Sequence, residues 1–421
     1  MTATAGRRDG PDRHEVRTVA ACFTAYGAVF FDRLAPLFLV GAIAADLGAP
    51  SAAEGTLALL IGLGWAAAMP VAGFTAQRSS AHRRLVLALL LAAVAAALSV
   101  TATSWSAFIV LRGVSGLAAA TGSPAVTSLA FTTIPAHRRG TSLGVVQSSP
   151  RLLGSLASPV VVTAVAVTAG WRSALLASAL VLAASALVFH ATLPTDIGRE
   201  VPATRHTRRP VLRPGGTRQL RVCALASVVL LSWLTIFSQS AVALVAVWQD
   251  RSLAAAGAQV GLFGIGAGVA ALLVPIASDR LGRGPALAVA TVIGGVSGVV
   301  LATAMLTGTA LPAPVSAGLM VGGGVAMGGL PLVISIVPAE TVDHGDVGRA
   351  LLLPIGLGEG LGAALLPAAA AVVAVHVGGA AVLGIAAAAV LLVGLSSRWV
   401  TPATHRPANG RVCALVRQRL T

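Results

Sequence analysis

The sequence contains no lysine, and only 10% of its 421 residues are charged. Soluble domains carry about a quarter charged residues, so this composition excludes an ordinary soluble domain. Hydrophobic residues make up 56% of the chain, and the mean hydropathy is +0.88. The scarcity of charge and the excess of apolar side chains predict a protein whose main partner is a lipid bilayer.

All 29 basic residues are arginine, and they give the chain a formal charge of +15. Nearly all of them fall in short breaks between apolar runs. This pattern is typical of a membrane protein with positive loops and not of a nucleic-acid groove, so we expect no nucleic-acid partner.

Cysteine is also scarce, with Cys22, Cys223 and Cys413 at unrelated spacings. This arrangement predicts neither a disulfide framework nor a metal site. Neither a cofactor motif nor a nucleophile constellation is present in the sequence, so we expect no cofactor and no enzymatic activity.

Long apolar runs dominate what remains, and a bilayer core needs about 20 apolar residues per helix. The first half of the chain gives six candidate spans: Val16–Ala45, Gly55–Ala76, Leu85–Ala102, Ser106–Thr132, Thr141–Thr168 and Trp171–Leu193. The second half gives six more: Arg221–Trp248, Ala258–Ala277, Pro285–Thr307, Leu311–Val337, Val347–Val375 and Ala380–Leu395. The sequence therefore predicts an all-α membrane protein with twelve transmembrane helices.

The arginines orient these spans. If both termini are cytoplasmic, 24 arginines fall on the inner side, and only Arg172 and Arg251 fall on the outer side. An excess of arginine in cytoplasmic loops is the rule for inner-membrane proteins. We therefore expect an integral protein of the plasma (inner) membrane with both ends inside.

The basic stretch 194–220 divides the spans into six plus six. We predict a cytoplasmic tail over 1–15, an N-terminal bundle over 16–193, this linker, a C-terminal bundle over 221–400 and a tail over 401–421. The halves also repeat short motifs at offsets of 202 to 208 residues, for example Gly154 to Pro159 against Gly362 to Pro367. Such matches indicate a duplicated six-helix unit.

Two loops carry a resemblance to a known family. Pro275-Ile-Ala-Ser-Asp279-Arg280-Leu-Gly282-Arg283 resembles the loop motif of the major facilitator superfamily, and Gly73-Phe-Thr-Ala-Gln77-Arg78 resembles its other copy with Gln in place of Asp. Leu111 to Gly116 resembles the helix 4 signature. The resemblance implies two six-helix bundles, solute transport, and gate loops that use Arg78, Asp279, Arg280 and Arg283.

Within that superfamily, Phe31-Asp32-Arg33 followed by Asp46-Leu47-Gly48 resembles the anion:cation symporter branch. In that branch the helix 1 Asp-Arg pair and the helix 4 arginine, here Arg112, are linked to proton and carboxylate binding. Ala119 stands where the branch often has a further acid.

Charges within the apolar runs are the main candidates for function, since such residues usually face a bundle interior or a cavity. Arg33 and Arg112 are the candidates for binding an anionic group, because a guanidinium grips a carboxylate through two hydrogen bonds. Asp32 and Glu359 are candidates for carrying a proton, with Asp32 as the first choice because Arg33 lies beside it and Glu359 as the second. Arg151 occupies the place equivalent to Glu359, 208 residues earlier, and is its candidate charge partner. The alternative for each is a static ion pair.

Uncharged candidates for the cavity lining are Trp65, Gln147 and Gln239, which offer stacking and hydrogen bonds. Their alternative role is helix packing. Together these residues predict a monomeric secondary transporter that moves a small organic solute, with proton-coupled uptake of an organic anion as the first hypothesis. The alternatives are proton-antiport efflux of a drug or natural product, and a non-transporting sensor or assembly protein on the same scaffold.

The predicted topology can be tested by labelling in intact cells. In a cysteine-free background, single cysteines at positions 205 and 403 should resist a membrane-impermeant thiol reagent, whereas a cysteine at position 49 should react. Reaction at 205 or 403 from outside the cell would overturn the orientation.

Overall fold

The computed structural model describes residues 12–50, 52–76, 79–134, 139–195, 216–342 and 347–400. The predicted gate residue Arg78, the C-terminal tail, and most of the N-terminal tail and of the linker lie outside these ranges. Nearly all of the described chain is helical, and no strand occurs in it.

The first half begins with a bent pair, α1 and α2, whose axes differ by 57°. Its elements are α1 (Arg13–Phe38), α2 (Val40–Asp46), α3 (Ala53–Ala76), α4 (Ala81–Val100), α5 (Trp105–Thr133), α6 (Arg139–Ser149), the π-helix η1 (Pro150–Ala157) and α7 (Ser158–Thr192).

The second half contains more interruptions. Its elements are α8 (Gly216–Trp248), α9 (Leu253–Leu281), α10 (Arg283–Thr307), α11 (Ala313–Val325), η2 (Ala326–Gly329), η3 (Leu332–Ile336), α12 (Val337–Glu340), α13 (Val347–Leu357), the π-helix η5 (Gly358–Leu365), α14 (Leu366–Val377), α15 (Gly379–Ser396) and η6 (Ser397–Trp399).

These elements form twelve membrane crossings. Ten described helices are long and apolar enough to span a bilayer, and the bent α1–α2 pair makes an eleventh. One of the ten runs for 49 residues, from Gly144 to Thr192. That is more than twice the length of a single crossing. The run breaks at Gly170, where φ is 81° and ψ is 163°, so it provides two crossings. The predicted fold class, an all-α membrane protein with two six-helix bundles, is confirmed.

The two halves share irregular features as well as helices. Gly378, between α14 and α15, has φ 87° and ψ 146°, close to the backbone of Gly170, 208 residues earlier. The π-helices η1 and η5 are also 208 residues apart at both ends. Positive φ favours glycine, and π-helices are rare in proteins. Their recurrence at one offset supports the duplication that the sequence motifs predicted.

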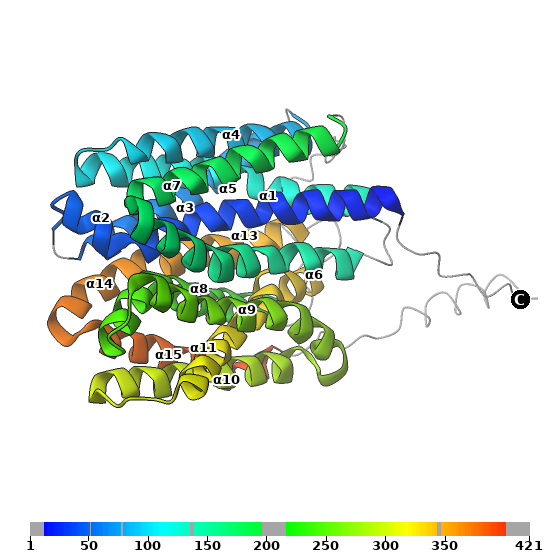
Figure 1. Ribbon diagram of the computed structural model, residues 1–421. Coiled ribbons are helices and arrows are strands. Elements are labelled where there is room, and N and C mark those ends of the chain that lie inside the picture. Colours follow the sequence, from blue (N-terminus) through cyan, green and yellow to red (C-terminus); the bar gives the residue numbers. More distant parts are fainter. Residues whose placement is uncertain are drawn as a thin grey trace, which may run out of the picture.

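Figure 1 shows the two halves side by side, with α1 to α7 in blue to green and α8 to α15 in green to red. We call the end where α1 begins and α15 finishes the basic end. The described arginines outside the helix centres gather there, apart from Arg172 and Arg251 at the opposite end. Large apolar side chains are exposed on the outward helices, among them Leu91, Leu187, Val289, Ile385 and Leu392. Such a belt is expected for helices that face lipid.

Small residues let the two halves approach each other. Helix α3 packs on η5 and α14, and α9 packs on η1 and α7. A Cβ added at Gly62 would lie 2.5 Å from the Cβ of Ala364, and one added at Gly264 would lie 2.2 Å from the backbone nitrogen of Leu156. Glycine is therefore required at Gly264, because the neighbouring atom is backbone and cannot move aside.

This contact leads to a stability prediction. Gly264→Ala should destabilise the protein by about 1–3 kcal/mol, because α9 and η1 must separate to admit the methyl group. Gly356→Ala is the matched control, since nothing lies within 4 Å of its added Cβ and helix propensity favours alanine. Thermal unfolding of the two purified variants measures the difference. Equal midpoints would contradict the close packing of the halves.

Candidate functional site

Five charged side chains are buried near the middle of the helices: Asp32, Arg33, Arg112, Arg151 and Glu359. Each is less than 10% exposed. Asp32 and Arg33 are adjacent on α1, and adjacent helical residues point about 100° apart. One can therefore face the interior of its own half while the other faces the opposite half.

Arg33 crosses the interface between the halves and pairs with Glu359 of η5. Its Nη2 lies 2.6 Å from Oε2, and its Nη1 lies 3.2 Å from Oε1. The guanidinium carbon also sits 3.9 Å from the ring centroid of Trp65 on α3. This is a two-pronged ion pair with a stacked aromatic face, and both geometries favour arginine over lysine. Trp65 is thus beside Arg33, where the sequence predicted a cavity residue.

Asp32 faces the interior of the first half and pairs with Arg112 of α5. The Arg112 Nη1 and Nη2 lie 3.1 and 2.9 Å from the Asp32 carboxylate oxygens. Ser178 and Ser115 donate hydrogen bonds to the same carboxylate at 2.7 and 3.2 Å. The structure therefore places Arg33 and Arg112 on different acids and does not bring them together.

A proline in α1 accounts for a further hydrogen bond of Arg112, to the backbone carbonyl of Asp32. Pro36 lies inside α1 and has no backbone N–H, so it leaves the carbonyl four residues earlier without its helical partner. That carbonyl belongs to Asp32, and the Nη2 of Arg112 donates to it at 2.6 Å. Arg112 thus compensates both a buried carboxylate and a backbone carbonyl freed by the proline.

Arg151 is the second residue of η1, as Glu359 is of η5. It is 5% exposed, and its side chain makes no hydrogen bond or ion pair with the described residues. It lies within electrostatic range of Arg33, Glu359 and Tyr26. Glu359 therefore pairs directly with Arg33, and Arg151 acts on it only at longer range.

Tyr26, the single tyrosine of the chain, is a member of this cluster that the sequence interpretation missed. Its ring packs edge-on against Phe30, with centroids 5.3 Å apart. Tyr26, Phe30 and Arg33 lie at positions i, i+4 and i+7 of α1, which share one helix face. This spacing is the sequence feature that could have identified Tyr26 as a neighbour of Arg33.

The remaining predicted lining residues lie near this cluster or one layer away. Gln147 is half-buried on α6, one turn before Arg151. Gln239 is buried on α8, where its Nε2 donates to the carbonyl of Pro367 at 3.4 Å and its Oε1 has no partner among the described residues.

At the basic end, the predicted gate loop of the second half forms an ion-pair network. The Nη1 of Arg283 lies 2.5 Å from Oδ1 of Asp279, and its Nη2 lies 2.8 Å from Oε1 of Glu340, the last residue of α12. Arg280 lies in the last turn of α9 beside it. These contacts tie the start of α10 to α9 and α12.

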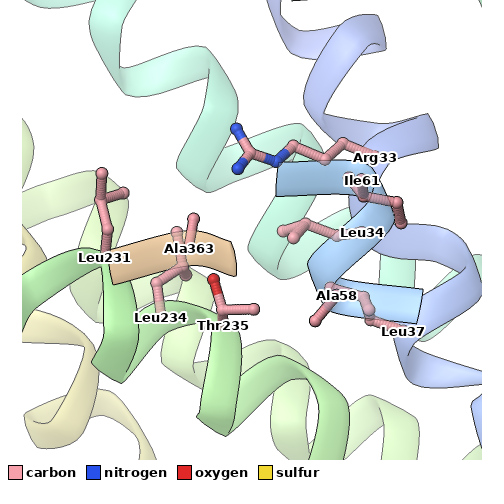
Figure 2. A pocket seen from close by; sticks show the side chains of 9 residues that line it. All are labelled: Arg33, Leu34, Leu37, Ala58, Ile61, Leu231, Leu234, Thr235 and Ala363. Atoms are coloured by element: carbon pink, nitrogen blue, oxygen red, sulfur yellow. The ribbon is translucent and has the colours of Figure 1, made fainter. Parts of the chain in front are cut away.

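A small central pocket opens beside Arg33, between the halves. Figure 2 shows Arg33, Leu34 and Leu37 facing Leu231, Leu234 and Thr235 across it, with Ala58, Ile61 and Ala363 completing the lining. Its volume is about 10 Å³, enough for one water molecule.

A larger hollow of about 360 Å³ lies at the end of the molecule opposite the basic end. Glu54 is the charged residue of its lining. Leu37, near the end of α1, lines the central pocket, and Val40, the first residue of α2, lines the hollow, so the two residues are three positions apart across the bend. The bend between α1 and α2 therefore lies between the central pocket and this hollow.

Comparison with known proteins identifies the family. Residues 21–251, more than half of the chain, match the model of the Major Facilitator Superfamily. The chain belongs to the Major Facilitator Superfamily. It is therefore an integral membrane protein of a transporter family, and not an enzyme.

Solved transporters of this superfamily have the same fold. A bacterial homolog of the human lysosomal transporter Spinster, in an inward-facing, unoccupied conformation, superposes with a TM-score of 0.66 at 13% identity, over 94% of this chain and all of its own. The nucleoside transporter NupG gives 0.69 at 13% identity, over 91% and 99% of the two chains. The peptide transporter POT, in complex with sulfate, gives 0.69 at 15%, over 93% and 95%. No curated protein matches the sequence.

The Asp32–Arg112 pair yields a stability prediction. Asp32→Ala or Arg112→Ala alone should each destabilise the protein by about 3–5 kcal/mol, because each leaves one buried charge without its partner. The double variant Asp32→Ala/Arg112→Ala should be less destabilised than the sum of the two. Thermal unfolding of the four proteins completes the cycle. Additive losses would show that the two residues do not stabilise each other.

Proposed function

We propose that this protein is a secondary transporter that couples proton entry to the uptake of a small organic anion by alternating access. The observation that supports this proposal is the ion pair between Arg33 and Glu359, which joins the two halves beside the central pocket. A residue that binds substrate and a residue that binds a proton are here partners of one another.

Competition for Arg33 explains the coupling. While Glu359 is ionised, it occupies the guanidinium that a substrate anion needs. Protonation removes its charge and weakens its hold, so Arg33 becomes free to bind the anion. By reciprocity, a bound anion raises the proton affinity of Glu359 by the same factor. Both then move in the same direction, as in symport.

Glu359 is a better proton carrier than Asp32 in this geometry. Asp32 accepts hydrogen bonds from Arg112, Ser115 and Ser178, all of which lie within its own half. Glu359 has Arg33 as its described partner, and that partner lies in the other half. When the halves move relative to each other, the environment of Glu359 changes and that of Asp32 does not.

The orientation of the cycle follows from the arginines. We assign the basic end to the cytoplasm and the hollow near Glu54 to the outer side, in line with the rule for positive loops. The segment from Leu37 to Val40, which lies between the central pocket and that hollow, is then the candidate outer gate. An inward proton gradient drives uptake through such a symporter.

An antiporter for a cationic drug makes the opposite prediction. A cation would compete with the proton for Glu359, so its binding would weaken as pH falls. Binding of an anion would strengthen as pH falls, because protonated Glu359 releases Arg33. The pH dependence of binding to the purified protein therefore separates the two functions.

Transport assays in vesicles with an imposed pH gradient test the coupling. Glu359→Gln should abolish accumulation against a gradient and preserve substrate exchange, because exchange requires no net proton release. Asp32→Asn serves as the comparison for the rival carrier, and it should lose stability before it loses coupling. If both variants still accumulate substrate, protons do not couple through these carboxylates.

A further inference from the structure

Arg151 is a buried cation without a described counter-charge in direct contact. Its residue is 5% exposed, its Nε has no partner, and no hydrogen bond or ion pair joins it to the described chain. An isolated charge at this depth is expensive to maintain. The proposed coupling of Arg33 and Glu359 gives Arg151 no role.

The charges around Arg151 do not balance. Arg33 and Glu359 neutralise each other through their ion pair, and Asp32 and Arg112 do the same within the first half. Tyr26 lies within electrostatic range of Arg33, Arg151 and Glu359, and it adds no charge because a phenol is neutral near pH 7. The cluster thus carries one positive charge while Glu359 is ionised, and two once Glu359 is protonated.

We infer that Arg151 is a second anion-binding residue of the central site and that the transported substrate carries two negative charges. This inference rests on the proposed function, because the second positive charge becomes available only when protonated Glu359 releases Arg33. A dianion then binds between Arg33 and Arg151. The loaded site, with its proton, is electrically neutral.

Position supports this pairing. Arg151 and Glu359 begin corresponding π-helices in opposite halves, and π-helices occur often at functional sites. Arg33 already reaches Glu359 across the interface. Arg151 lies within electrostatic range of both Arg33 and Glu359, so a ligand that takes the place of Glu359 on Arg33 comes within range of Arg151. Tyr26 adds a hydroxyl on the same face of α1.

Two ligand chemistries meet this description, namely a small dicarboxylate and a phosphate monoester. Both present two negative charges to paired guanidinium groups. Matched probes distinguish charge from shape: succinate against its monoamide succinamate, glutarate against glutaramate, and methyl phosphate against dimethyl phosphate. At pH 7.5 each pair differs mainly by one negative charge, because the second pKa of a phosphate monoester is about 6.

The test measures binding of these six probes to the full-length purified protein by calorimetry at pH 6 and pH 7.5. At least one dianion should bind about tenfold to a hundredfold more tightly than its monoanionic partner. Arg151→Gln should abolish that preference, and Arg151→Lys should keep part of it. Arg172→Gln, which removes an exposed arginine at the opposite end, should leave it unchanged.

Stability supplies a second readout that does not depend on the probes. If Arg151 is kept for binding, Arg151→Gln should unfold at a higher temperature than the parent, because it removes an unpaired buried charge. A residue with a purely structural role would lower the unfolding temperature on substitution.

The inference is overturned if no dianion binds better than its monoanionic partner, or if Arg151→Gln retains the preference. Failure of the proposed function has a different signature. In that case Glu359→Gln would still accumulate substrate with the pH gradient, whatever the charge preference of Arg151.

Discussion

The high free energy of a charge in hydrocarbon governs the arrangement of this protein. Two acids and three arginines lie deep in the bundle, and two ion pairs form among them. One pair, Asp32 with Arg112, is enclosed in a single half and strengthened by two serines and a proline-freed carbonyl. The other, Arg33 with Glu359, spans the halves. The first pair can stay fixed through a transport cycle, while the second must respond whenever the halves move.

The difference between these pairs comes from one step along α1. Asp32 and Arg33 are neighbours in sequence, and the helix turns them about 100° apart. A single helix thereby contributes one charge to an ion pair within its own bundle and one charge to an ion pair across the interface. Trp65 stacks on the Arg33 guanidinium, and Arg33 lines the central pocket.

The fold was predictable because its signals are local. The length of each apolar run identifies a membrane crossing. The arginines in the breaks between runs show that successive breaks lie on alternating sides of the membrane, so twelve helices were predicted from the sequence.

The partners of the buried charges could not be predicted in this way. The sequence offered Arg151 as the charge partner of Glu359, whereas the structure pairs Glu359 with Arg33. The choice between the two arginines depends on how helices from opposite halves rotate against each other. That rotation is set by contacts between residues 326 apart, which no local pattern encodes. The π-helices were missed for a related reason, since neither residue type nor hydrophobic periodicity distinguishes them from α-helix.

The paired π-helices also bear on how this chain is aligned with distant members of its superfamily. A π-helix accommodates an extra residue by closing its hydrogen bonds one position further along. Everything that follows η1 or η5 is therefore rotated relative to a regular helix with the same starting point. A relative that lacks the bulge needs a one-residue gap in the fifth and eleventh membrane helices. An ungapped alignment would assign lipid-facing residues to the pocket from residue 158 in one half and residue 366 in the other.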